Sequence, residues 1–177
     1  HKMIQLHDKY FVDFISNQDI QSINQRLADQ IYHDYFDKSP IFIGVLSGAF
    51  LFLSDLIKYY GGYCYVDFVK FKSYSGLQST GNVETLLDFP DIKGKDVVIV
   101  EDIVDTGRTL EKILQRVDEL GAKTYKIASL FFKPEAFQFD YHIDYIGKNI
   151  PDKFIVGYGL DYDGLGRNLP DIYQLKK

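Results

Sequence analysis

The sequence has 177 residues, 46% of them hydrophobic, which is enough to build a single domain with a substantial core. Its formal net charge is -5 and its only basic run is the short pair Lys176-Lys177, which argues against a protein that binds nucleic acid. No stretch approaches the roughly 20 apolar residues that cross a bilayer, so we expect a cytoplasmic protein that does not enter a membrane.

The first half of the sequence alternates between helical and strand patterns. Apolar residues recur at helical spacing over positions 20–31, and Ser16 or Asn17 is suited to cap that helix. The elements predicted next are a buried strand at Ile41–Leu46, an apolar helix at Phe50–Tyr59, a strand at 63–71 and a short strand at Val83–Leu87. The single cysteine, Cys64, has no histidine nearby in sequence, and we interpret it as a core thiol.

The second half predicts further strands and a third helix. A β-branched strand ends near Val100, and a helix over 109–120 ends at Gly121. The other predicted strands are Thr124–Phe132, 141–146 and 154–156, followed by an irregular tail. This alternation predicts an α/β fold with a central, largely parallel sheet flanked by helices. Ligands of such folds bind beyond the carboxyl ends of the strands, so we expect the loops after Leu46, Phe71, Val100 and Phe132 to meet at one site.

Three carboxylates follow the strand that ends near Val100. Glu101 and Asp102 are adjacent, and Asp105 opens a short turn before the next helix. Such a concentration of negative charge is unfavourable unless the carboxylates contact hydroxyl groups, a cationic centre or a divalent metal. A sugar phosphate bound with Mg²⁺ would satisfy all three.

The turn itself has the composition of an anion site. The first N-H groups of a helix lack intrahelical partners and lie at the positive end of the helix dipole, so they favour an anion. Gly107 lets the backbone approach the ligand, while the hydroxyls of Thr106 and Thr109 can donate to phosphate oxygens and Arg108 adds charge. The turn therefore predicts a phosphate site.

Residues 100–109 resemble the phosphoribosyl-diphosphate (PRPP) motif of the type I phosphoribosyltransferases, in which apolar residues precede two acidic residues, Asp-Thr-Gly, a small or basic residue and Thr. The alternative is a strand-turn-helix connection whose acidic residues only solvate the loop. The resemblance implies a type I phosphoribosyltransferase fold and one domain over 1–177. Its core would cover about 38–150, and a small hood would form from the N-terminal segment and about 151–177.

This resemblance implies a role for each residue of the motif. Glu101 and Asp102 would hold the ribose hydroxyls and Mg²⁺, and Asp105 would act as general acid/base at N7 of a purine. The residues implied in binding the ribose and the 5'-phosphate are Glu101, Asp102, Asp105, Thr106, Gly107, Arg108 and Thr109.

Two further segments resemble pyrophosphate-binding parts of the hypoxanthine-guanine phosphoribosyltransferases. Leu46-Ser47-Gly48 matches their short loop after the first strand, although many members have Lys where this chain has Ser47, so backbone N-H groups would do the binding. Arg167 corresponds to a late arginine that reaches pyrophosphate, although the residues before it depart from the usual spacing. The alternative for the first segment is a turn between a strand and a helix that binds no ligand.

The polar segment at about 72–82 resembles the mobile catalytic loop of the same family. Its composition suits a lid that closes over the reacting centre and excludes water, and Ser73 and Tyr74 would contact pyrophosphate in the closed state. The alternative is an ordinary surface loop.

A base-binding region is implied by residues near and after the strand Thr124–Phe132. An ammonium group at Lys133 can donate to the six-position oxygen of an oxopurine. Residues 151–162 resemble the purine pocket of the family, with Phe154 stacked on the base, Ile155 reading its edge through the backbone, and Asp161 near the base and the metal. The alternative for Phe154 is a core aromatic.

The resemblance implies purine salvage. The enzyme would transfer the 5-phosphoribosyl group of PRPP to N9 of hypoxanthine or guanine with Mg²⁺, giving IMP or GMP and pyrophosphate. One alternative is the same transfer to xanthine or a pyrimidine. Another is a regulator with the transferase fold that senses nucleotides and binds RNA, which the acidic balance disfavours. Because the family commonly assembles, we expect a homodimer or homotetramer.

Overall fold

The computed structural model describes residues 2–73 and 83–177. Its main sheet has six strands in the order β5-β4-β3-β6-β7-β8. The strands from β4 to β8 in this order pair in parallel, and β5 pairs with β4 antiparallel. The bounds are β3 (Ile41–Leu46), β4 (Tyr65–Ser73), β5 (Val83–Leu87), β6 (Asp96–Val104), β7 (Thr124–Phe132) and β8 (Tyr145–Asn149).

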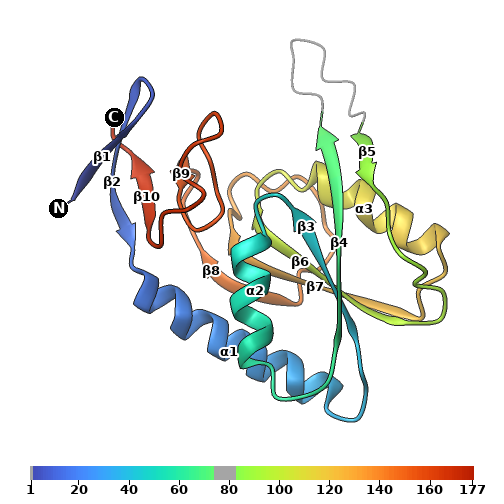
Figure 1. Cartoon of the computed structure of the whole chain (residues 1–177). Coiled ribbons are helices and arrows are strands. Elements are labelled where there is room, and N and C mark those ends of the chain that lie inside the picture. The colour runs from blue at the N-terminus through green and yellow to red at the C-terminus, as the bar shows by residue number, and fades with distance from the viewer. Residues whose placement is uncertain (1, 74–82) are drawn as a thin grey trace.

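Helices cover both faces of this sheet (Figure 1). Their bounds are α1 (Asn17–Tyr35), α2 (Phe50–Tyr59) and α3 (Arg108–Glu119). In β6, Val98 and Val100 belong to the core formed with α1 and α2, whereas Val97 and Ile99 belong to the core formed with α3. A strand covered on both faces is apolar nearly throughout, and this explains the continuous apolar run that precedes Glu101.

A second, four-stranded antiparallel sheet forms the hood. Its strands are β1 (Met3–Leu6), β2 (Lys9–Ile15), β9 (Ile155–Val156) and β10 (Ile172–Leu175), in the order β1-β2-β10-β9. The sheet thus joins strands from near the two ends of the chain (Figure 1), and Phe11, Val156 and Tyr173 form its small core. The predicted fold class, an α/β fold with a largely parallel sheet and a hood from the chain-terminal segments, is confirmed.

Most predicted elements agree with the structure. Ser16 is the N-cap of α1, and its hydroxyl accepts a hydrogen bond from the Asp19 N-H at 3.2 Å. Strands β3, β5 and β7 and helix α2 have the predicted bounds. Cys64 is a half-buried free thiol that packs against the core shared with α1 and α2, and burial raises its pKa.

Three predictions about the elements were wrong. The tail is not irregular, because Ile172–Leu175 pairs with β2 and β9. The predicted strand 141–146 starts only at Tyr145, since the rings of Phe137, Phe139 and Tyr141 pack on one another before it. Strand β6 continues past Val100 to Val104, so the acidic pair lies on the strand and not in a loop.

In the described part of the chain, no helix has both the length and the apolar character needed to cross a membrane.

Candidate active site

Two neighbouring cavities lie at the carboxyl ends of the parallel strands. Their volumes are about 240 Å³ and about 280 Å³, and Gly48, Asp102, Ile103 and Asp105 line both. The first, which we call the phosphate cavity, is also lined by the turn 104–110. The second, which we call the base cavity, is also lined by Lys133 and by residues of the segment 154–167. The expected gathering of loops at one edge of the sheet is thus observed for β3, β6 and β7.

The turn of the phosphate cavity requires glycine at position 107. Gly107 is the N-cap of α3 and has a φ of 87°, in the left-handed region that residues with a side chain rarely adopt. A Cβ there would also lie 2.5 Å from the Tyr141 hydroxyl and 2.6 Å from the Phe137 ring. Tyr141 donates to the Gly107 carbonyl at 2.6 Å, and burial raises the pKa of Tyr141 so that its hydroxyl remains a donor. Tyr141 and Phe137 therefore fix the conformation of this turn.

Glu101 is buried and Asp102 is half-buried, so negative charge on this acidic pair is costly. Glu101 is only 7% exposed, and its pKa is raised well above the usual value by burial and by the charge of Asp102. Burial raises the pKa of Asp102 to about 6. The Ile103 N-H, which donates to its carboxylate at 2.8 Å, acts in the opposite direction and lowers the pKa. Two adjacent carboxylates in this environment fit a site whose ligand brings positive charge or hydroxyl groups.

A metal in this site would depend on the substrate for most of its ligands. Within residues 2–73 and 83–177, no three His, Cys, Asp or Glu side chains form a metal-binding group, so Glu101, Asp102 and Asp161 do not make a complete cage. Mg²⁺ is usually bound by one or two carboxylates together with waters and substrate phosphates. Glu101 and Asp102, which line the phosphate cavity, are a donor set that fits that mode of binding.

Lys133 and Asp105 meet at the base cavity. The Lys133 ammonium lies 3.2 Å from Asp105 Oδ2 and 3.3 Å from Asp152 Oδ1, and Lys133 is only 5% exposed. A buried ammonium needs such partners, because an unpaired charge away from water is strongly unfavourable. Sequence reasoning missed Asp152, whose pairing with Lys133 has no signal in the local sequence.

Three of the four predicted pyrophosphate residues line the cavities. Leu46 and Gly48 line the phosphate cavity, and Arg167 lines the base cavity beside Gly48. Arg167 donates to the Gly159 carbonyl at 2.6 Å and pairs with Asp161 at 3.2 Å. In the described part of the chain, Ser47 lines neither cavity.

Two glycines make this side of the site compact. A Cβ on Gly48 would overlap the Asp102 carboxylate, and a Cβ on Gly159 would overlap the Gly48 carbonyl. Gly159 also has a φ of 99°. The segment that carries Arg167 therefore packs directly on the loop after β3, a contact that sequence reasoning did not predict.

Phe154 offers an exposed ring to the base cavity. It is 44% exposed, which contradicts the core-aromatic alternative, and it packs at ring-centroid distances of 6.2 Å from Phe11 and 5.9 Å from Tyr162. Ile155 and Asp161 line the same cavity. Ser73 is the last residue of β4, while Tyr74 and the rest of the predicted lid, residues 74–82, lie outside the described residues.

Known proteins resemble this chain along almost its whole length. Residues 14–163 match the family model of the phosphoribosyl transferase domain. The hypoxanthine-guanine phosphoribosyltransferase of Staphylococcus epidermidis is 42% identical over 164 residues, which cover 92% of this chain and 92% of that protein. The protein of the same name from Staphylococcus aureus is 40% identical over 173 residues, which cover 97% of each chain.

Solved structures agree with the sequence relatives. The crystal structure of a hypoxanthine phosphoribosyltransferase from Staphylococcus aureus superposes with a TM-score of 0.88 and 41% identity, over 93% of this chain and 90% of that one. A hypoxanthine-guanine phosphoribosyltransferase from Bacillus anthracis, with a HEPES molecule in its active site, gives a TM-score of 0.88 and 38% identity, over 93% of this chain and 98% of that one.

Proposed function

Because the chain belongs to the hypoxanthine-guanine phosphoribosyltransferases of the phosphoribosyl transferase family, we propose that it is a purine salvage enzyme. It transfers the 5-phosphoribosyl group of PRPP to N9 of hypoxanthine or guanine, giving IMP or GMP and pyrophosphate. The resemblance predicted from the sequence is confirmed. The alternatives, a transferase for xanthine or a pyrimidine and an RNA-binding regulator, are not favoured by the relatives.

The adjacency of the two cavities is the observation that carries this proposal. Asp102 and Asp105 line both, so a base in one cavity would lie beside a sugar phosphate in the other. Effective catalysis of a transfer between two substrates requires this mutual orientation. Residues 105–109 would anchor the 5'-phosphate, and Leu46, Ser47, Gly48 and Arg167 would bind the pyrophosphate.

The pair formed by Lys133 and Asp105 matches the edge of a 6-oxopurine. Guanine presents two neighbouring acceptors, O6 and N7, on this edge, whereas adenine presents an amino donor in place of O6. Lys133 would donate to O6, and Asp105, 3.2 Å from the ammonium, would hold or release the proton at N7. Phe154 would stack on the base and Ile155 would contact it through the backbone. This arrangement favours hypoxanthine or guanine over adenine.

Glu101 and Asp102 would serve the sugar and the metal. Their carboxylates would bind the ribose hydroxyls and stabilise the positive charge that the sugar gains as its bond to pyrophosphate breaks. Together with Asp161, they would hold Mg²⁺. The bound metal ion would neutralise the charge of the diphosphate. The lid role of Ser73 and Tyr74, the homodimeric or homotetrameric assembly and the cytoplasmic location stay predictions.

A pyrophosphate-release assay with PRPP tests the proposed function. We expect rapid release with hypoxanthine and guanine, and much slower release with xanthine, adenine and uracil. Chelation of Mg²⁺ with EDTA should abolish release, and excess Mg²⁺ should restore it, because the free diphosphate carries uncompensated charge. Transfer to uracil alone, or no transfer together with salt-sensitive binding of RNA, would contradict the proposal.

Replacement of Lys133 tests the base site. Lys133→Ala removes a charged donor to O6, and such a hydrogen bond contributes about 1.5–3 kcal/mol, so we expect the KM for hypoxanthine to rise by about 10- to 100-fold. The KM for PRPP should stay close to the wild-type value. Lys126→Ala is the matched control, because Lys126 also pairs with a carboxylate, Asp34 at 3.3 Å, but lies outside both cavities. Equal loss of affinity for both substrates in a folded sample would rule out the assigned role.

A further inference from the structure

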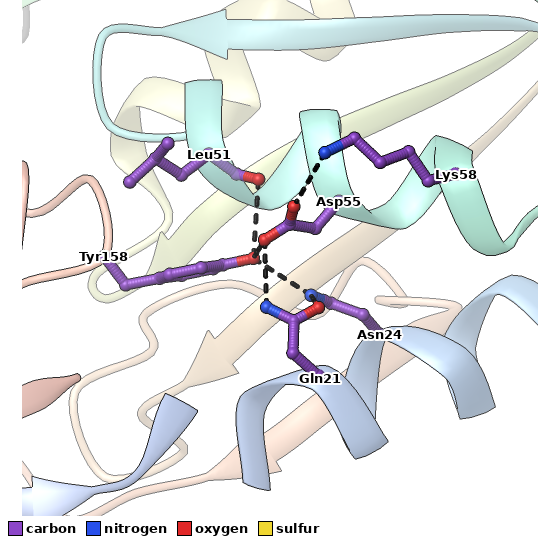
Figure 2. Close-up of polar contacts among 6 residues, drawn as sticks. All are labelled: Gln21, Asn24, Leu51, Asp55, Lys58 and Tyr158. Atoms are coloured by element: carbon purple, nitrogen blue, oxygen red, sulfur yellow. Dashed lines mark hydrogen bonds and ion pairs between the residues drawn. The ribbon is translucent and has the colours of Figure 1, made fainter. Parts of the chain in front are cut away.

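Tyr158 lies between the hood and the helices of the main sheet (Figure 2). It belongs to residues 157–160, which we call the hood turn, and its ring reaches between α1 and α2. Tyr158 is only 3% exposed, and its φ of 48° places a residue with a side chain in the left-handed region. Such a conformation persists only where the surrounding contacts impose it.

The Tyr158 hydroxyl has partners on both helices. Asn24 of α1 donates to it at 2.9 Å, so the hydroxyl gives its own hydrogen to Asp55 of α2, whose Oδ2 lies 2.5 Å away (Figure 2). Asp55 also accepts from Gln21 at 2.9 Å and pairs with Lys58 at 3.4 Å. Burial, and then the bond to Asp55, raises the pKa of Tyr158, so the hydroxyl remains protonated and keeps this direction of donation.

The hood turn connects this network to the pyrophosphate side of the site. Gly159, the next residue, donates to the Arg167 carbonyl at 2.9 Å and accepts from the Arg167 guanidinium at 2.6 Å. Gly159 also packs against the Gly48 carbonyl without room for a Cβ. Gly48 and Arg167 are both predicted to bind pyrophosphate; Gly48 lines both cavities and Arg167 lines the base cavity.

Helix α2 connects the same network to the loop of Gly48 from the other side. The Phe50 N-H donates to the Ser47 carbonyl at 3.2 Å, and the Leu53 N-H donates to the Ala49 carbonyl at 2.9 Å. The loop and the first turns of α2 are therefore joined by backbone hydrogen bonds. Tyr158 is bonded to α2 through Asp55, and Gly159 of the same hood turn packs against the loop of Gly48.

We propose that Tyr158, through its hydrogen bond to Asp55, is a positioning residue. It holds Arg167 and the Gly48 loop in the relative position that binding of pyrophosphate requires. The inference rests on the proposed function, because it concerns the pyrophosphate of PRPP. Ile155, which would contact the purine, has separate support, since it pairs with Gln174 of β10 in the hood sheet. Loss of the hydroxyl should therefore affect PRPP and pyrophosphate more than the purine.

Tyr158→Phe is the first test, because it removes only the hydroxyl. We expect the KM for PRPP and the Kd for magnesium pyrophosphate, measured by calorimetry, to rise by about 10-fold, as a small misplacement of binding groups is costly. The KM for hypoxanthine should change by less than about 2-fold. Asp55→Ala should reproduce this pattern, whereas Asp55→Asn, which keeps an acceptor oxygen, should largely restore wild-type values. The double variant of Tyr158→Phe and Asp55→Ala should be no worse than either single variant.

Tyr145→Phe is the matched control. Tyr145 is 5% exposed and donates to Asp34 of α1 at 2.5 Å, but it lies outside both cavities. Its loss should lower the melting temperature about as much as Tyr158→Phe does and leave the Kd for pyrophosphate unchanged. If Tyr158→Phe behaves like this control, the positioning role is wrong. A wild-type enzyme that binds pyrophosphate but transfers no phosphoribosyl group would refute the proposed function, and the pyrophosphate measurements would still decide the role of Tyr158.

Discussion

Asp105→Asn should slow turnover by about 10²- to 10⁴-fold, which is the usual contribution of general acid/base catalysis. The amide has nearly the size of the carboxylate but cannot take up or release the N7 proton. PRPP affinity should stay close to the wild-type value, because the 5'-phosphate would be anchored by the backbone and hydroxyls of the turn. The Asp105 side chain is 49% exposed and so is open to an incoming base. Steady-state pyrophosphate release and PRPP titration measure the two quantities.

Asp152→Asn separates proton transfer from the ion pair with Lys133. Asp152 lies 3.3 Å from the Lys133 ammonium, almost the same distance as Asp105. Its replacement weakens the support of Lys133 but removes no group from the predicted proton transfer, so turnover should fall by less than about 10-fold. Equal losses in the two variants would mean that Asp105 acts only as a partner of Lys133. Unchanged turnover in Asp105→Asn would remove it from catalysis altogether.

The centre of the site could be predicted from the sequence because it is local. Residues 101–109 are contiguous, and their acidic, hydroxyl and glycine chemistry follows from the end of one strand and the start of one helix. The rule that parallel strands present their loops at one edge then placed the loop of Gly48 and Lys133 near them. The structure bears out this arrangement in the linings of the two cavities.

The hood could not be predicted from local pattern. Strand β10 has four residues, too few to show a period of two, and it exists because β2 pairs with it from the other end of the chain. The hydrogen bond from the Asn17 N-H to Asp171, 2.7 Å long, also joins residues that are 154 positions apart in sequence, so local pattern could not predict it. The partnerships of Tyr158 with Asp55 and of Gly159 with Gly48 are equally non-local, so only the folded structure reveals them.

Aromatic packing also overrode a local pattern at 141–146. The alternating sequence there predicts a strand, yet Tyr141 stacks on Phe139 at a centroid distance of 5.6 Å and donates to the Gly107 carbonyl. These contacts hold Tyr141 beside the phosphate turn, and the sheet is joined only from Tyr145 onward. A residue predicted to be part of a strand thus supports the site instead.

Gly48→Ala should lower kcat/KM for PRPP by about 10²-fold, because a displacement of about 1 Å in a catalytic site costs this much. The new Cβ would overlap the Asp102 carboxylate. Either the loop after β3 moves away from the site or the Asp102 side chain rotates, and both groups are predicted to bind PRPP. The effect should appear in the kinetics of pyrophosphate release and in PRPP affinity.

Gly61→Ala is the control for the loss of a glycine as such. Gly61 follows α2, and a Cβ there would lie 4.0 Å from the nearest atoms, those of the Tyr32 ring, so activity should be unchanged. Melting temperatures of both variants separate a local rearrangement from unfolding. Wild-type kinetics in Gly48→Ala would mean that the loop and Asp102 need not be in contact. The close approach of the loop to the acidic pair would then have no part in binding PRPP.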